Sequence, residues 1–208
     1  MRILYDIGAN KGLYTDTLID KYDKCILVEA NPVLCKYLQD KYSNNTKIKI
    51  VNVIVSKDEN VQFYVSNADT LSTADISWIT DSRFTKDYSW KAIDGVSTMS
   101  LDSIIRQEGT PSFIKIDVEG YELNVIKSLT QKYSGLCFEW AEEKKEEIIQ
   151  TIEYLSEIGY SQFAIQNKDD YNYSVPNEDW TTKEKIILYC NSFFDTKRRS
   201  EWGMIWAL

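Results

Sequence analysis

The sequence predicts one α/β domain of 208 residues, with a mostly parallel central sheet and helices on both of its faces. Three observations predict this fold. Short apolar runs typical of buried strands alternate with segments whose apolar residues recur at helical spacing. A glycine-bearing turn at residues 6–12 follows the first run and leads into the first helix. The chain is 43% apolar, which is enough to bury one full core. About seven strands are expected, with the last one antiparallel.

Each expected element follows from its residues. Short apolar runs predict strands at residues 3–6, 24–29, 47–56, 61–65, 113–118, 136–140, 160–165 and 185–190, the last two as a candidate hairpin. Helical spacing predicts helices at residues 13–19, 32–41, 122–131 and 142–158, and one that begins near residue 101. Pro32 stands near the first turn of its helix, where proline fits well.

Residues 66–95 interrupt this alternation. They are polar and contain Trp78, Phe84, Tyr88 and Trp90. We expect one domain over residues 1–208, with this segment inserted as a lid above the carboxyl ends of the strands, where ligands bind in parallel sheets.

The turn at residues 6–12, DIGANKG, indicates a nucleotide-type cofactor site. A strand–turn–helix of this kind presents backbone N–H groups to a ligand, and Asp6 would place a carboxylate beside it. A dinucleotide fingerprint requires glycine where this chain has Asn10. The D-x-G-x-x-x-G form, with Gly8 and Gly12, better resembles the first motif of methyltransferases that bind S-adenosylmethionine. A plain tight turn is the alternative interpretation.

A second acid, Glu29, follows the expected strand at residues 24–29. A carboxylate at this position can accept hydrogen bonds from both ribose hydroxyls of an adenosine ligand. The same arrangement serves NAD and S-adenosylmethionine, so Glu29 supports an adenosine cofactor without distinguishing the two.

A third group of acids lies in the segment KIDVEGYE, residues 115–122. Asp117 is still within an apolar strand, where an unpaired carboxylate is costly, so it is a functional candidate. Glu119 is open to a structural interpretation as well, because acids at a helix N-terminus complement the helix dipole.

Composition excludes several classes of function. The chain contains no histidine, so a histidine base, triad or metal ligand is excluded. The net charge of −8 argues against nucleic acid as a partner. The four cysteines lack CxxC spacing, which favours reduced thiols. No run of 18 apolar residues and no signal peptide is visible, so we expect a cytoplasmic protein without a membrane partner.

The motifs resemble, in order and spacing, those of the FkbM-type methyltransferases. The resemblance covers roughly residues 3–140, and KIDVEGYE is its most specific part. It implies a Rossmann-like class I fold and S-adenosylmethionine as the cofactor, with methyl transfer to oxygen on sugars, polyketides or other small metabolites. Asp6, Gly8, Asn10 and Gly12 would line the methionine end of the cofactor, Glu29 would bind the ribose, and Asp117 would lie near the transferable methyl group. The cofactor-binding set is completed by Ala9, Tyr14, Thr15, Ala30 and Asn31.

A hydroxyl acceptor must lose a proton during transfer, and carboxylates are the available bases. Asp117, Glu119 and Glu139 are the catalytic candidates. A divalent metal bound by two of them could do the same work. We favour direct carboxylate assistance and predict no metal site, because three acids without histidine supply few ligands for a metal ion.

The acceptor is expected to be a small molecule, most simply a sugar or glycoconjugate. Ser72 and Thr73 offer hydroxyls, while Trp78 and Trp90 offer flat faces that suit a sugar ring. These aromatic residues could instead pack the lid onto the body. Trp202 and Trp206, four residues apart, suggest helix packing or a subunit interface, and a homodimer would help to cover the cavity.

Two alternative functions remain open at the level of the sequence. An NAD(P)-dependent oxidoreductase would share Asp6 and Glu29 but leaves KIDVEGYE unexplained. A methyltransferase-like binding protein without catalysis would have the same cofactor site.

Overall fold

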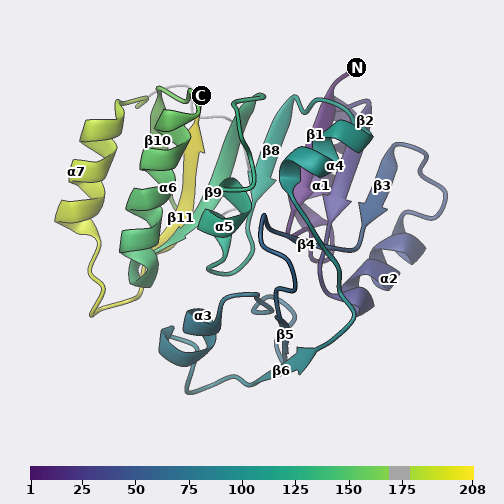
Figure 1. The fold of residues 1–208 in the computed structure, drawn as a ribbon, viewed down its shortest axis with the longest axis horizontal. Helices are drawn as coiled ribbons and strands as arrows, with labels where there is room; N and C mark the ends of the chain where they lie inside the picture. The colour runs from purple at the N-terminus through teal and green to yellow at the C-terminus, as the bar shows by residue number, and fades with distance from the viewer. Residues whose placement is uncertain (169–178) are drawn as a thin grey trace.

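A computed structural model describes residues 1–168 and 179–208. A seven-stranded sheet forms its centre, in the order β10-β11-β9-β8-β1-β2-β3 (Figure 1). The strands span Ile3–Ile7 (β1), Lys24–Val28 (β2), Ile48–Val51 (β3), Phe113–Ile116 (β8), Gly135–Ala141 (β9), Phe163–Asn167 (β10) and Trp202–Ala207 (β11). β11 runs antiparallel to both of its neighbours, and the other pairings are parallel. The predicted mostly parallel sheet with a final antiparallel strand is confirmed.

Helices cover both faces of this sheet, and side-chain alternation along β1 decides which residues meet them. Ile3, Tyr5 and Ile7 point into the larger cluster, while Leu4 points into the smaller one. The larger cluster is formed with α4 (Leu101–Glu108), α5 (Glu122–Ile126), α6 (Lys145–Glu157) and α7 (Lys183–Phe193). The smaller cluster is formed with α1 (Leu13–Leu18) and α2 (Pro32–Lys41). Two 3-10 turns complete the helical segments, η1 (Ile19–Lys21) and η2 (Glu142–Lys144).

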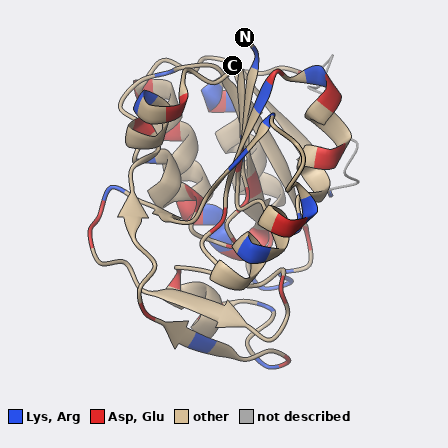
Figure 2. Ribbon diagram, turned by 90° about the vertical axis from the view of Figure 1, so that its right-hand side faces the viewer, with Lys and Arg blue, Asp and Glu red and all other residues tan. Residues whose placement is uncertain are grey.

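The lid segment, residues 66–95, lies beyond the carboxyl ends of the parallel strands, and both ribbon views show it below the sheet (Figures 1 and 2). It contains α3 (Ile76–Asp81) and β6 (Trp90–Ile93). β6 pairs antiparallel with β5 (Phe63–Ser66), and a second small pair joins β4 (Ile54–Val55) to β7 (Thr98–Met99). The segment therefore has regular structure of its own.

Ion pairs fasten the lid segment to the body. Lys144, at the end of η2, binds Asp75, which caps the N-terminus of α3. Arg83 lies 3.0 Å from a carboxylate oxygen of Glu143, and the side chain of Glu143 is 3% exposed. Lys11, beside the glycine turn, lies 2.5 Å from Asp69. The lid segment is thus tied to the body through Asp69, Asp75 and Arg83.

Three predictions of secondary structure are wrong. Residues 185–190 form part of α7 and not a strand, because Ile186 and Cys190 are buried at a spacing of four. The last strand is β11, where we expected Trp202 and Trp206 to pack as a helix or at an interface. Residues 47–56 form two strands, β3 and β4, and not one; between them the Asn52 side chain donates hydrogen bonds to the carbonyl oxygens of residues 29 and 30.

None of the helices in the described residues is long and apolar enough to cross a membrane.

Candidate active site

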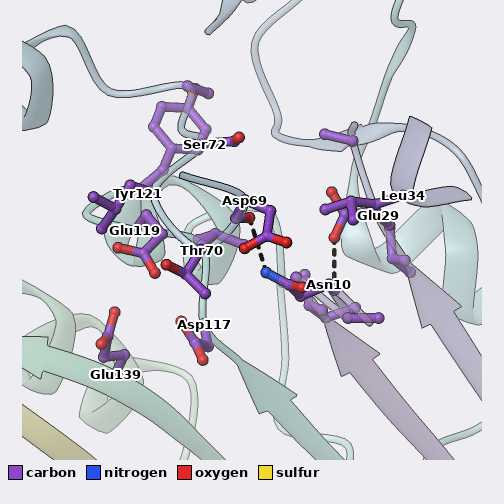
Figure 3. Close-up of a pocket in the computed structure, with 18 of the residues that line it drawn as sticks. Asn10, Glu29, Leu34, Asp69, Thr70, Ser72, Asp117, Glu119, Tyr121 and Glu139 are labelled. Atoms are coloured by element: carbon purple, nitrogen blue, oxygen red, sulfur yellow. Dashed lines mark hydrogen bonds between the residues drawn. The ribbon is translucent and has the colours of Figure 1, made fainter. Parts of the chain in front are cut away.

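A cavity of about 570 Å³ opens between the carboxyl edge of the sheet and the lid segment (Figure 3). Its size is in the range that proteins use for small ligands. The ends of β1, β2, β8 and β9 supply one wall, through Gly8, Glu29, Asp117 and Glu139. The lid segment supplies the opposite wall. The carboxyl edge therefore holds the site that the strand order predicts.

The glycine turn after β1 is organised by hydrogen bonds from Asn10. Its backbone N–H donates to a carboxylate oxygen of Glu29 at 2.8 Å, and its side-chain amide donates to the carbonyl oxygen of Asp69 at 2.9 Å (Figure 3). Asn10 has φ = 47°, the left-handed conformation that asparagine tolerates. One residue thus links the turn, the end of β2 and the lid segment.

The two motif glycines are required by protein neighbours. Gly8 has φ = 77°, and a Cβ there would lie 1.7 Å from the carbonyl oxygen of Asp117. Gly12 has φ = 74°, and a Cβ there would lie 2.5 Å from the hydroxyl oxygen of Tyr42. The sequence suggested that glycine lets the backbone approach a ligand. The structure shows that these glycines let β1 and α1 approach the KIDVEGYE segment and α2.

Glu29 is buried at the end of β2, with a side chain that lines the cavity. Its two carboxylate oxygens accept one backbone N–H each, from Asn10 and Asn31, both at 2.8 Å. Burial raises the pKa of Glu29, and these two hydrogen bonds partly offset that shift. Each oxygen keeps a further acceptor position, so the carboxylate can also receive the two hydroxyls of a ribose.

Two neighbouring strands, β1 and β8, place an acid–base–acid group at the floor of the cavity. Lys115 lies 3.0 Å from Asp117 and 3.5 Å from Asp6, and it donates to the carbonyl oxygen of Gly8 at 3.3 Å. Thr15 donates to the other oxygen of Asp6 at 2.7 Å. Burial raises the pKa of Asp6; burial would lower the pKa of Lys115, but Asp117 and Asp6 together raise it. Lys115 therefore stays charged and holds both acids in place.

Acids gather on the β8 and β9 side of the cavity. One carboxylate oxygen from each of Asp117, Glu122 and Glu139 lies within 4.8 Å of the others. Figure 3 shows Glu119 and Glu139 beside Asp117, with all three carboxylates in the same part of the cavity. Burial raises the pKa of Glu119 and of Glu139 well above 4.5, and the charge of Asp117 raises both further. This side of the cavity favours a protonated or positively charged partner.

The structure separates the predicted cofactor residues into two groups. Those that line the cavity are Gly8, Ala9, Asn10, Tyr14, Glu29, Ala30 and Asp117. The others lie behind that wall: Asp6, Gly12, Thr15 and Asn31. Asp6 is fully buried and bound to Thr15 and Lys115, so it supports the turn from below where we expected it beside the ligand. Asn31 contributes the N-cap of α2 and a backbone N–H to Glu29.

All three catalytic candidates, Asp117, Glu119 and Glu139, line the cavity, but only half of the predicted acceptor residues do. Ser72 and Trp78 are part of its wall. Thr73 is buried and donates to the backbone carbonyl oxygen of Glu119 at 2.7 Å. The indole N–H of Trp90 donates to the carbonyl oxygen of Leu71 at 2.6 Å, so Trp90 packs the lid segment.

Sequence reasoning missed several residues of the cavity wall, among them Leu34, Arg83, Tyr121 and Trp202. Tyr121 belongs to the KIDVEGYE motif and could have been found from it. Trp202 enters the wall from β11, a strand that the sequence did not reveal. Arg83 had no signal beyond its position in the lid segment.

The strand order is that of the Rossmann-like class I methyltransferase fold. Two solved structures share the fold at a TM-score of 0.50 and 7% identity. One is described as a precorrin 8W decarboxylase from Methanobacterium thermoautotrophicum, aligned over 100% of this chain and 81% of that one. The other is a dimethyladenosine transferase from Plasmodium falciparum, aligned over 100% of this chain and 56% of that one.

Fibrillarin from Aeropyrum pernix, solved with natively bound S-adenosyl-L-methionine, is similar at a TM-score of 0.49 and 13% identity, over 100% of this chain and 66% of that one. No curated protein matches the chain significantly. The methyltransferase FkbM domain matches residues 6–162, and the chain belongs to this family. Its cofactor is S-adenosylmethionine, which decides against the oxidoreductase alternative.

Proposed function

We propose that this protein transfers the methyl group of S-adenosylmethionine to a hydroxyl oxygen of a small acceptor, most simply a sugar or glycoconjugate. The observation on which this rests is the pair Glu119 and Glu139. Both line the cavity, and neither carboxylate has a hydrogen bond or an ion pair with a described residue. Unpaired carboxylates with raised pKa values are suited to remove a proton near neutral pH.

Within this pair we assign the base to Glu139. Asp117 is held by Lys115 at 3.0 Å, which suits it to orient the reacting groups. Glu139 lies within β9, and side chains on strands are held more accurately than those on loops. Glu119 stands in a left-handed turn with φ = 57° and contributes the neighbouring negative charge.

Bound S-adenosylmethionine supplies a methyl group on a positively charged sulfur. In the transfer, the acceptor oxygen forms a bond to the methyl carbon as the carbon–sulfur bond breaks, and the hydroxyl proton passes to Glu139. Glu29 holds the adenosine end, at the end of β2, which is separated from β9 by β8 and β1. The lid segment excludes water, so that alignment and desolvation supply most of the acceleration.

A sugar acceptor is supported by the residues on the lid side of the cavity. Thr70 and Ser72 place hydroxyl groups in the wall, and Phe84 and Tyr88 place aromatic rings there. This mixture of apolar rings and a few polar groups is typical of sites that hold sugar rings.

The test is a methyl-transfer assay over a panel of methyl glycosides. We expect turnover with at least one glycoside, and a loss of about a hundredfold or more in kcat for Glu139→Gln, with binding of S-adenosylhomocysteine unchanged. Binding of S-adenosylhomocysteine without turnover of any glycoside would favour the non-catalytic alternative.

A divalent metal is the second candidate for lowering the hydroxyl pKa, because the oxygens of Asp117, Glu122 and Glu139 lie close enough to share one ion. The glycoside assay is therefore run after treatment with a chelator. We expect full activity, since we propose direct proton transfer to Glu139. Activity lost to the chelator and restored by Mg²⁺ or Mn²⁺ would replace that role with metal binding.

A further inference from the structure

A turn at residues 118–120 brings Glu119 into the wall of the cavity. Glu119 has φ = 57°, and the next residue, Gly120, has φ = 90°. The left-handed conformation is unfavourable for a residue with a Cβ, and it persists only where the surroundings impose it. In this conformation the Glu119 carboxylate lies in the same part of the cavity as those of Asp117 and Glu139 (Figure 3). The groups that hold the turn therefore decide where this carboxylate lies.

Glu122 holds the turn from the body of the protein. One of its carboxylate oxygens accepts the backbone N–H groups of Val118 and Gly120, at 2.9 Å and 3.3 Å. Glu122 is the first residue of α5 and is buried, so the core keeps it in place. These two hydrogen bonds fix the N–H groups on either side of Glu119, but they do not fix its carbonyl group.

Thr73, in the lid segment, holds that carbonyl group. Thr73 is fully buried, and its hydroxyl donates to the carbonyl oxygen of Glu119 at 2.7 Å. The same hydroxyl accepts the backbone N–H of Asp75 at 2.9 Å, which fixes its orientation. The Thr73 backbone pairs with Tyr64 of β5 through hydrogen bonds of 2.8 Å and 3.0 Å. The turn is therefore held between Glu122 on one side and the lid segment on the other.

We propose that Thr73 is a positioning residue for methyl transfer, and that it acts through Glu119. By holding the Glu119 carbonyl oxygen, Thr73 keeps the turn in its left-handed conformation and the Glu119 carboxylate beside Glu139. The proposal rests on the proposed function, because it takes Glu139 as the base. A negative charge beside Glu139 favours the transfer of a proton to it, and this effect weakens with distance. Since Thr73 belongs to the lid segment, the acid pair is complete only while the lid segment is in place.

The first test is a double-mutant cycle on kcat at pH 8, with the glycoside that the wild-type protein methylates fastest. Thr73→Val removes the hydroxyl and keeps the shape of the side chain. It should lower kcat about tenfold, with KM and the affinity for S-adenosylhomocysteine unchanged. In the Glu119→Gln background, which lacks the charge that Thr73 positions, the same substitution should leave kcat unchanged. An effect that reaches the cavity through Asp75 and α3 would instead be equal in both backgrounds.

Three further variants complete this test. Thr73→Ser keeps the hydroxyl and should retain most of the wild-type kcat. Thr73→Cys has only a weak donor and enters the same cycle, so the result does not depend on the folding of one variant. Thr151→Val is the matched control, because Thr151 is also buried, its hydroxyl donates to the carbonyl oxygen of Glu147 at 2.8 Å, and it does not line the main cavity. It should leave kcat unchanged.

The second test does not depend on the acceptor. It compares crystal structures of the wild-type protein, Thr73→Val and Thr151→Val, each with S-adenosylhomocysteine. We expect the Glu119 carboxylate to leave its place beside Glu139 in Thr73→Val, and to keep it in Thr151→Val.

The proposal is overturned if Glu119 keeps its place in Thr73→Val, if Thr73→Val retains the wild-type kcat, or if the loss of kcat is the same with and without the Glu119 charge. Each of these outcomes leaves the proposed function intact. Absence of S-adenosylhomocysteine binding, or of turnover of any glycoside by the wild-type protein, would instead count against the proposed function, and the crystal structures would still decide whether Thr73 positions Glu119.

Discussion

The ammonium group of Lys115 lies 3.0 Å from a carboxylate oxygen of Asp117, two residues further along the chain. The Lys115 side chain is 5% exposed, and it also lies 3.5 Å from Asp6, which is fully buried. One cation thus compensates two acids on neighbouring strands and fixes the floor of the cavity. Removing it would leave two carboxylates in a low-dielectric site, where an unpaired charge is costly.

Lys115→Met should therefore destabilise the protein by about 3 kcal/mol at pH 7, measured by urea denaturation. The control is Lys36→Met, which removes one partner of an exposed ion pair with Asp40 at 2.8 Å. Exposed pairs contribute little, so we expect almost no change there. Equal effects of the two substitutions would show that Lys115 does not hold the acids as described.

Gly8→Ala should disrupt the site because the added methyl group would clash with the neighbouring backbone. A Cβ at Gly8 would overlap the carbonyl oxygen of Asp117, so we expect a loss of about 3 kcal/mol or more and a large loss of S-adenosylhomocysteine affinity. Gly95→Ala is the matched control, because Gly95 also has a positive φ, 84°, but a Cβ there would have no heavy atom within 4 Å. It should cost only the backbone strain, about 1 kcal/mol. Denaturation and calorimetry on both variants distinguish packing from strain.

Glu29→Gln should lower the affinity for S-adenosylhomocysteine about tenfold or more, measured by calorimetry. The amide has one acceptor oxygen, so it cannot accept both backbone N–H groups and the ribose hydroxyls. Glu108→Gln is the control, since Glu108 pairs with Lys24 at 2.8 Å and does not line the cavity. An affinity for Glu29→Gln that equals wild type would exclude Glu29 from the cofactor site.

The raised pKa of Glu139 predicts opposite effects on stability and activity. A carboxyl whose pKa is higher in the folded protein than its usual 4.5 keeps a proton that the unfolded chain releases. Stability should therefore fall as pH rises from about 4.5 through the raised pKa. Activity should rise over the same pH range, because the base must lose its proton.

Glu139→Gln removes this ionisation. We expect the variant to be more stable than wild type at pH 8, by thermal unfolding, and to lose kcat. If stability at pH 8 is unchanged or lower, Glu139 is not the strained carboxylate that we describe.

The sequence predicted the strands that build the edge of the site. β1, β2, β8 and β9 are continuous apolar runs because parallel strands are buried on both faces, and such runs are easy to recognise. β11 is also buried, but it was missed because the spacing of Trp202 and Trp206 resembles that of a helix.

The position of Asp6 could not be predicted from its motif. Asp6 is paired in register with Lys115 on β8, so both side chains point to the same face of the sheet. Register is set by tertiary packing and is not visible in either strand alone. The sequence thus identified Asp6 as a candidate, but only its pairing with Lys115 shows that it supports the cavity from below.

The central claim is that the cavity at the carboxyl edge binds S-adenosylmethionine, with Glu29 at one end and the acids of β8 and β9 at the other. Calorimetric titration of the wild-type protein with S-adenosylhomocysteine, in parallel with NADH, tests it most directly. We predict binding of one S-adenosylhomocysteine per chain and no heat with NADH. Binding of NADH, or no heat with S-adenosylhomocysteine, would contradict the claim.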